Sequence, residues 1–302
     1  MPYSLPSDLL WFIVQFKRSR TTNRLTTEER ARILTVLSEG MGINAACRVT
    51  GASKNTVLKL LADVGRACAL YQDQTMRGLT VTQLQVDEIW SFIGAKQKNV
   101  PAESDPALGL GDCYTYTAID PVTKLMPCWL VGYRTFESAD HFMADLAPRL
   151  ANRVQITPTD AMSGYPRAVA KHFGNNLDFA VLNKSYEGDM PQVEAKRRYS
   201  PAVCIGATKN VVCGSLDLKD VSTSHVERAN LSMRMGMRRF TRLTNAFSKK
   251  IENHMHAVSF YFMAYNFLKV HSSVRTTPAI AAGVTAIKWT MEEIMNMADT
   301  ME

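Results

Sequence analysis

Residues 84–94 read LQVDEIWSFIG, and this stretch decides the fold that we expect. Apolar and polar residues alternate along it, and it is rich in Val, Ile, Trp and Phe, which is typical of a β-strand. Asp87 lies in the middle of this strand, and its neighbour Glu88 must point to the opposite face. A carboxylate in such an apolar strand is costly unless it is paired or binds a metal ion. Asp87 is therefore the first candidate site residue.

Further strands and helices follow in a recognisable order. The strands are expected at residues 113–120, 125–134, 153–160 and 177–182, the helices at 137–150 and 163–173, and an irregular insertion at 184–222. Three antiparallel strands come first, and a helix precedes each of the last two. This order, followed by the insertion and a further helix, is the order of the ribonuclease H fold. The sequence thus predicts an α/β protein with a ribonuclease H-like mixed five-stranded sheet and flanking helices.

A second acid, Asp160, ends the strand RVQITPTD and precedes a predicted helix. This position is at the carboxyl edge of the sheet, where the sites of α/β proteins are built. The alternative for Asp160 is a plain N-cap of the helix that follows it.

The third acid lies in the basic stretch KDVSTSHVERANLSMRMGMRRFTRLTNAFSKK, residues 219–250. Seven Lys or Arg and no acid occur from Arg228 to Lys250, and Glu227 comes just before them. On a helix continued to residue 243, Glu227, Arg234, Arg238 and, more loosely, Arg242 would share the face opposite an apolar stripe. Arg suits phosphate, and a carboxylate beside bound phosphate needs a cation between them, which suggests a metal ligand. The alternative is a solvated basic helix with an incidental Glu.

The chain before residue 77 predicts a basic arm at 1–24 and an all-α helix-turn-helix domain at 25–76. Thr26 or Thr27 can cap a first helix, Gly51 lies at a turn, and Ser53 can cap the third helix. Residues 1–70 hold ten Lys/Arg and five Asp/Glu, a net charge of +5. The residues expected to contact DNA from the third helix are Ser53, Lys54, Asn55, Thr56 and Lys59. The alternative is a small helical bundle that serves dimerisation.

Composition supports an anionic partner without identifying it. The net charge of the chain is +7 and its pI is about 9.1. None of the six Cys forms a CxxC pair, so we expect reduced thiols in a cytoplasmic protein. No apolar run approaches the roughly 18 residues of a membrane span.

The three acids together suggest one chemistry. Asp87, Asp160 and Glu227 would converge at one edge of the predicted sheet, where three carboxylates can hold two divalent ions about 4 Å apart. Such ions activate a water or a 3′-hydroxyl and stabilise the leaving oxygen of a phosphodiester. Hard oxygen ligands favour Mg²⁺.

Several segments carry a resemblance to a known family. The segments VDEIWSF, TPTDAMSGYP, STSHVERANLSMRMGMRRFTRLTNAFSKK and YNFLKVHSSVRTTPAIAAG, with the late Trp289, resemble bacterial insertion-sequence-one type transposases. These enzymes belong to the DDE, retroviral-integrase-like superfamily. The resemblance implies that Asp87, Asp160 and Glu227 form a catalytic triad that binds two Mg²⁺ or Mn²⁺ ions. It also implies binding of terminal inverted repeats, cleavage at their 3′ ends and joining to target DNA. Many relatives carry an N-terminal Cys-rich zinc motif, which this sequence lacks.

The resemblance completes the set of expectations. The residues expected to bind DNA in the basic stretch are Arg228, Asn230, Arg234, Arg238, Arg239, Arg242, Lys249 and Lys250. For His225 the two alternatives are an accessory role in catalysis and a local structural role. A catalytic domain is expected at 77–270 and a tail at 271–302. The partners would be double-stranded transposon-end and target DNA, bound by at least a dimer in the bacterial cytoplasm at the nucleoid. The alternatives are a non-catalytic DNA-binding repressor or domesticated remnant, and a structure-specific nuclease that cuts without joining.

Overall fold

A computed structural model describes residues 25–159, 164–174, 177–186, 204–241 and 244–301 of the 302-residue chain. Within these residues, six strands form one mixed sheet in the order β3-β2-β1-β4-β5-β6. The strands span Gln83–Ile93 (β1), Gly111–Ile119 (β2), Trp129–Gly132 (β3), Val154–Pro158 (β4), Leu177–Tyr186 (β5) and Cys204–Cys213 (β6). The α-helices span Thr27–Ser38 (α2), Ile43–Thr50 (α3), Lys54–Thr75 (α4), Phe136–Leu146 (α5), Gly164–Phe173 (α6), Ser224–Gly236 (α7), Ile251–Met263 (α8), Pro278–Ala281 (α9) and Met291–Thr300 (α10). Single turns of other helix types lie at Gln97–Asn99 (η1), Pro106–Leu108 (η2), Ala147–Arg149 (η3), Arg238–Phe240 (η4) and Ala264–Leu268 (η5).

The strand predicted from LQVDEIWSFIG is β1, and it lies inside the sheet. It pairs antiparallel with β2, where Asp87 is opposite Thr117, and parallel with β4, where Val86 is opposite Pro158. The first five strands follow the order that the sequence predicts for a ribonuclease H-like sheet. The parallel pair places the end of β4 level with the middle of β1, beside Asp87.

The predicted count of five strands is wrong, because β6 adds a sixth strand from within the segment expected to be an irregular insertion. β6 pairs antiparallel with β5, which itself continues to Tyr186. Nearly every residue of β6 is exposed on this edge strand. With no face buried, the sequence of β6 carries no alternation of apolar and polar residues, and periodicity could not reveal it.

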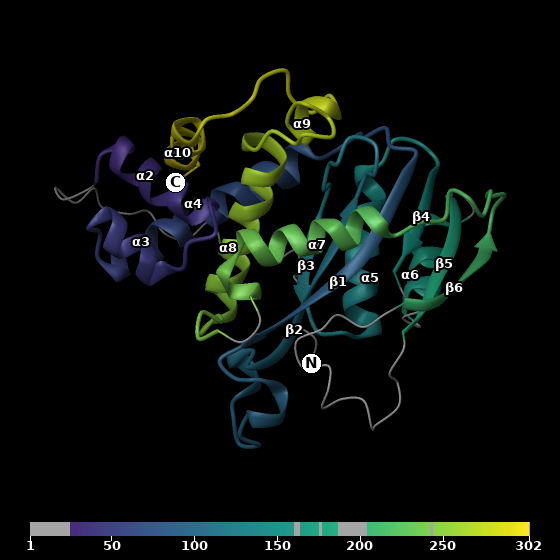
Figure 1. Cartoon of the computed structure of the whole chain (residues 1–302), viewed down its shortest axis with the longest axis horizontal. Coiled ribbons are helices and arrows are strands. Elements are labelled where there is room, and N and C mark those ends of the chain that lie inside the picture. Colours follow the sequence, from purple (N-terminus) through teal and green to yellow (C-terminus); the bar gives the residue numbers. More distant parts are fainter. Residues whose placement is uncertain (1–24, 160–163, 175–176, 187–203, 242–243, 302) are drawn as a thin grey trace.

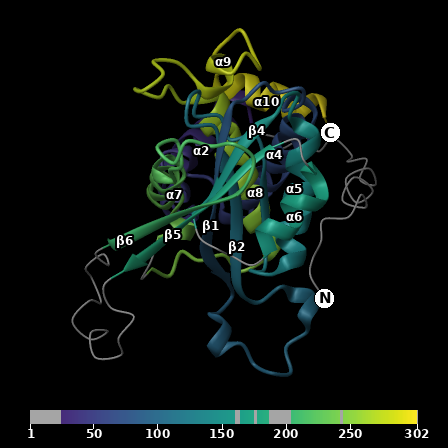
Figure 2. The same ribbon diagram turned by 90° about the vertical axis from the view of Figure 1, so that its right-hand side faces the viewer.

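Helices cover both faces of the sheet (Figures 1 and 2). Helices α5 and α6 pack on one face, against Leu84, Val86 and Tyr116. Helices α7 and α8 pack on the other face, where Ile89 and Ile93 of β1 are buried. The alternation along β1 thus sends Asp87 toward α7, and Glu88 toward the opposite layer, where Arg134 lies 3.6 Å from its carboxylate.

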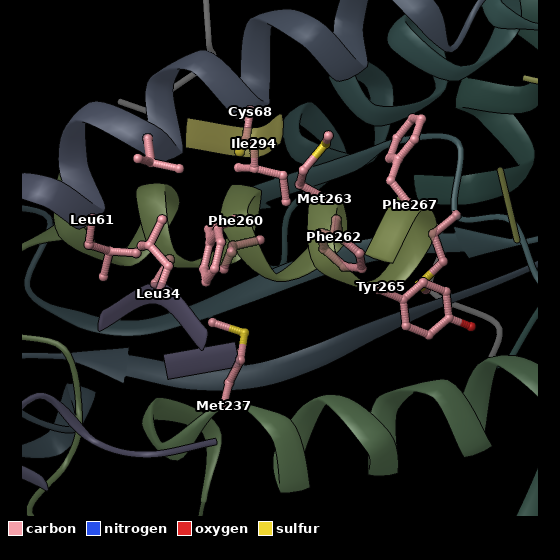
Figure 3. Close-up of a cluster of buried hydrophobic side chains, with 14 of the residues drawn as sticks. Leu34, Leu61, Cys68, Met237, Phe260, Phe262, Met263, Tyr265, Phe267 and Ile294 are labelled. Atoms are coloured by element: carbon pink, nitrogen blue, oxygen red, sulfur yellow. The ribbon is translucent and has the colours of Figure 1, made fainter. Parts of the chain in front are cut away.

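The N-terminal helices α2, α3 and α4 form where the sequence predicts three helices. Thr26 caps α2 in a capping box with Glu29, Gly51 takes a left-handed φ of 75° after α3, and Ser53 caps α4. A role of these helices as a DNA-binding helix-turn-helix stays a prediction. They share one hydrophobic cluster with α8 and α10, in which Leu34 and Leu61 meet residues such as Phe260 and Ile294 (Figure 3).

Two helices end earlier than the sequence predicts. The sequence predicts that α7 continues to residue 243, but the helix ends at Gly236, where the Tyr261 ring lies 3.1 Å from the position a Cβ would take. Met237 is extended, and η4 follows it. The helix expected at 251–271 ends at Met263 and continues as the π-helical turn η5. Among the residues described here, no helix is both long and apolar enough to span a membrane.

A buried histidine links α8 to the sheet. The Nδ1 atom of His254 lies 2.8 Å from the Ser248 hydroxyl, and its Nε2 atom lies 3.4 Å from the Ser91 hydroxyl. Burial, and secondarily the Arg239 guanidinium, lowers the pKa of His254 from 6.5 to about 3. His254 is therefore neutral in the folded protein throughout the range in which the unfolded chain becomes protonated.

We expect the protein to lose stability as the pH falls below about 6.5. Below this pH the His254 side chain is protonated in the unfolded state but stays neutral in the folded state. The free energy of unfolding therefore falls by up to about 1.4 kcal/mol per pH unit, until the pH reaches the folded-state pKa of about 3. His254→Asn should show a shallower pH dependence in urea unfolding, although it will be less stable at pH 7. His141→Asn, a substitution of a histidine on α5, serves as the control. An unchanged slope in His254→Asn would contradict this account.

Candidate active site

Asp87 is held from two directions. Its Oδ2 atom accepts a hydrogen bond of 2.6 Å from the side-chain amide of Asn230 on α7. Its Oδ1 atom accepts a hydrogen bond from the hydroxyl of Thr159, just after β4. The carboxylate on β1 is thereby joined to both α7 and the end of β4.

The end of β4 leads to the second predicted acid. The Thr159 amide donates a hydrogen bond of 2.9 Å to the Val86 carbonyl, which continues the pairing of β4 with β1 beyond Pro158. Asp160 lies outside the described residues. In the chain it directly follows Thr159, the residue whose hydroxyl contacts Asp87.

Glu227 lies in the first turn of α7, three residues before Asn230, so both side chains project from one side of the helix. Its Oε1 atom accepts a hydrogen bond of 2.7 Å from the Thr223 hydroxyl. The same oxygen forms an ion pair with Lys184 of β5, whose side chain is only 19% exposed. One side of α7 thus connects to β1 through Asn230 and to β5 through Glu227.

Gln85 fixes the start of α7, and the sequence did not single it out. Its side-chain oxygen accepts hydrogen bonds from the backbone amides of His225, at 2.8 Å, and Val226, at 3.1 Å. The first backbone amides of a helix have no hydrogen-bond acceptor within the helix. The buried side-chain oxygen of Gln85 supplies this acceptor and so stabilises the start of α7. The sequence could have indicated Gln85 in one way: it lies two residues before Asp87, so its side chain is on the same face of the strand.

The donor atoms suit a hard divalent cation. Asp87 and Glu227 supply carboxylate oxygens, and the side-chain oxygen of Asn230 is buried with no hydrogen-bond donor among the residues described. Mg²⁺ prefers such oxygen ligands. No group of three His, Cys, Asp or Glu side chains suited to a metal occurs in the described part of the chain. The predicted triad cannot appear there in full, because Asp160 lies outside it.

His225 faces a different direction from Glu227. Its position is about 200° around the helix, and its Nδ1 atom lies 3.1 Å from the Nζ atom of Lys124. Burial, followed by the charge of Lys124, lowers the pKa of His225 below 6.5. Its accessory role stays a prediction.

Many of the predicted DNA-binding residues gather in one groove with a volume of about 1310 Å³. The predicted residues that line it are Lys54, Arg228, Arg238, Arg239, Lys249 and Lys250. Those described but outside its lining are Ser53, Asn55, Thr56, Lys59, Asn230 and Arg234. Arg242 falls outside the described residues. Because α7 ends at Gly236, Arg238 and Arg239 reach the groove from η4 and do not share a helix face with Glu227.

Comparisons with known proteins leave the family open. No protein-family model matches the chain, and no curated protein matches it. A piggyBac transposase synaptic complex with hairpin DNA is similar at 13% identity and a TM-score of 0.39, over 98% of this chain and 75% of that chain. A pre-cleavage Mos1 transpososome is similar at 12% identity and a TM-score of 0.22, over 54% of this chain and 61% of that chain. With TM-scores this low, neither likeness carries a conclusion about function.

We expect Gln85→Leu to destabilise the protein by about 1–3 kcal/mol, because two buried helix amides would lose their acceptor. Urea unfolding measures this loss. Gln83→Leu is the matched control on the same strand face, since Gln83 donates a single hydrogen bond to the exposed Asp220 carbonyl. Its effect should stay below about 1 kcal/mol. Equal losses in both variants would show that Gln85 has no special part in holding α7.

Proposed function

We propose that this protein is a DNA transposase of the DDE type, which binds the terminal inverted repeats of an insertion sequence and catalyses metal-dependent strand cleavage and strand transfer. One observation carries the proposal, namely the hydrogen bond between Asn230 and Asp87. It joins the central strand of a ribonuclease H-like sheet to the helix whose first turn carries Glu227. The end of β4, which precedes Asp160, contacts the same carboxylate through Thr159.

In this proposal Asp87, Asp160 and Glu227 hold two divalent ions, Mg²⁺ or Mn²⁺. When bound, the ions activate a water or a 3′-hydroxyl and stabilise the leaving oxygen of a phosphodiester. Asn230 and Thr159 orient the Asp87 carboxylate through its two oxygens. Thr223 orients Glu227 from one helical turn away. The exposed Lys and Arg side chains beyond α7 bind phosphates and so supply affinity for DNA.

Lys184 supplies a positive charge beside Glu227. Its ammonium group pairs with Glu227, and its side chain is only 19% exposed. A cation bound by Glu227 would compete with this ion pair. We propose that Lys184 balances the charge of Glu227 until the ions bind and then turns to the phosphate of the substrate.

The central test of the function uses three isosteric substitutions. Asp87→Asn, Asp160→Asn and Glu227→Gln should each reduce Mg²⁺-dependent cleavage and joining of end-containing DNA to background, because each removes a charged metal ligand. Glu252→Gln, which changes an exposed carboxylate on α8, is the control and should keep full activity. Circular dichroism and DNA binding without metal check that the variants fold.

Each other result of this assay would favour a different function. Wild-type cleavage in all three variants would overturn the triad. Cleavage by the wild-type protein without joining would identify a structure-specific nuclease. DNA that the wild-type protein binds but never cuts would identify a repressor or a domesticated remnant.

Lys184→Gln should strengthen the binding of a divalent ion to the DNA-free protein. Removing a partly buried ion pair of this kind frees Glu227 at a gain of up to about 1 kcal/mol, or about fivefold in affinity. Calorimetric titration with Mn²⁺ measures this change without any reaction. Lys209→Gln is the control, because Lys209 lies on the neighbouring strand β6 and donates to the Leu218 carbonyl. Unchanged or weaker Mn²⁺ binding in Lys184→Gln would contradict a competing role for Lys184.

A further inference from the structure

The groove beside α7 is lined by nine Lys or Arg residues that come from separate parts of the chain. They are Arg48, Lys54, Lys124, Arg228, Arg238, Arg239, Lys249, Lys250 and Lys269. No Asp or Glu occurs among the described residues that line the groove. The chain as a whole has 35 basic and 28 acidic residues, so this separation of charge is local and strong.

Most of these charges are available to a ligand. Arg48, Lys54, Arg228, Arg238, Lys249 and Lys250 are exposed, and none of them pairs with a carboxylate of the described residues. Lys269 contributes less, because it lies 3.3 Å from the Glu39 carboxylate. A dense set of like charges without counter-charges is destabilising in an isolated protein and is explained by a polyanionic ligand.

The groove has two walls, which contact each other. Arg48 of α3 and Lys54 of α4 belong to the first wall, and Arg228 of α7 and Lys250 before α8 belong to the second. A Cβ on Gly40, in the turn between α2 and α3, would lie 2.8 Å from the Met235 carbonyl of α7. The walls are thus packed together through a glycine, and a ligand meets both as one surface.

The groove also lies beside the candidate active site. Arg228 faces the groove, whereas its neighbour Glu227 lies about 100° further around α7 and pairs with Lys184 of β5. Figure 1 shows α7 crossing in front of β1, with the N-terminal helices near one end and β5 near the other. A DNA backbone that follows the groove would therefore pass along the helix that carries Glu227.

We propose that one continuous segment of duplex DNA lies in this groove, with its phosphates contacted by both walls at once. The inference rests on the proposed function, because it takes DNA as the substrate. Lys and Arg contacts of this kind position the backbone without reading sequence. Ser53 and Asn55 adjoin Lys54 outside the groove lining, where they can reach base edges while Lys54 holds a phosphate. The N-terminal helices and the acid cluster would then act on the same DNA molecule.

The test measures binding of a short labelled duplex by fluorescence anisotropy in EDTA over a series of salt concentrations. The first-wall variant is Arg48→Gln with Lys54→Gln, the second-wall variant is Arg228→Gln with Lys250→Gln, and a fourfold variant combines them. The slope of log K against log salt is negative, and each lost phosphate contact should reduce its magnitude by about 0.9. Each pair should therefore reduce the magnitude by about 2 and the fourfold variant by about 4, with unchanged stoichiometry. The control Arg32→Gln with Lys288→Gln removes the same charge from exposed positions outside the groove and should change the slope little.

Three results would overturn the inference. A wall pair that leaves the slope unchanged would show that the two walls do not share one DNA. A change in stoichiometry between the two pairs would show that they hold separate duplexes. Preference for single-stranded RNA in competition would assign the groove to another nucleic acid. Because the assay contains no metal and no cleavage, a protein that binds in this way but never cuts would contradict the proposed function and leave this inference intact.

Discussion

The hydrogen bond between the Asn230 amide and the Asp87 carboxylate is the contact on which the rest of the site depends. A carboxylate in an apolar strand is costly unless partners compensate it, and here the Asn230 amide of α7 does so together with the Thr159 hydroxyl after β4. The bond to Asn230 also joins α7 to β1. Gln85, two residues earlier on the same face, fixes the start of the helix through two backbone amides. With both contacts made, the direction of Glu227 is determined by the helix.

This arrangement resolves an apparent conflict of charge in the sequence. One Glu beside seven basic residues would repel the phosphates that those residues attract. In the structure α7 presents its residues in separate directions. Glu227 and Asn230 face β5 and β1, Val226 and Met233 are buried, and Arg228 faces the groove. Glu227 and Arg228 are neighbours in sequence, yet they belong to two different surfaces.

The strands and helix caps that depend on neighbouring residues were predicted from the sequence. The alternation in LQVDEIWSFIG predicted β1 and the opposite directions of Asp87 and Glu88, and Thr26 and Ser53 cap helices as expected. Three features escaped prediction for separate reasons. β6 has no buried face and thus no periodicity. Helix α7 ends at Gly236, which packs against the Tyr261 ring of α8, and the sequence does not show this contact between distant segments. The groove is assembled from distant segments, so the sequence showed its basic residues without showing that Arg48 and Lys250 share one surface.

The N-terminal helices pack against α8, and this packing connects the first wall of the groove to α7. Helix α8 lies between α4 and the sheet, and its residue Phe260 belongs to the same buried cluster as Leu34 of α2 and Met237 at the end of α7 (Figure 3). The close approach of α4 and α8 requires Gly65, because a Cβ there would lie 2.6 Å from His256. Close-packed interiors transmit displacements, since they leave no space to absorb them. The first wall of the groove is therefore joined through α8 to the end of α7 by continuous close packing, and the other end of that helix carries Glu227.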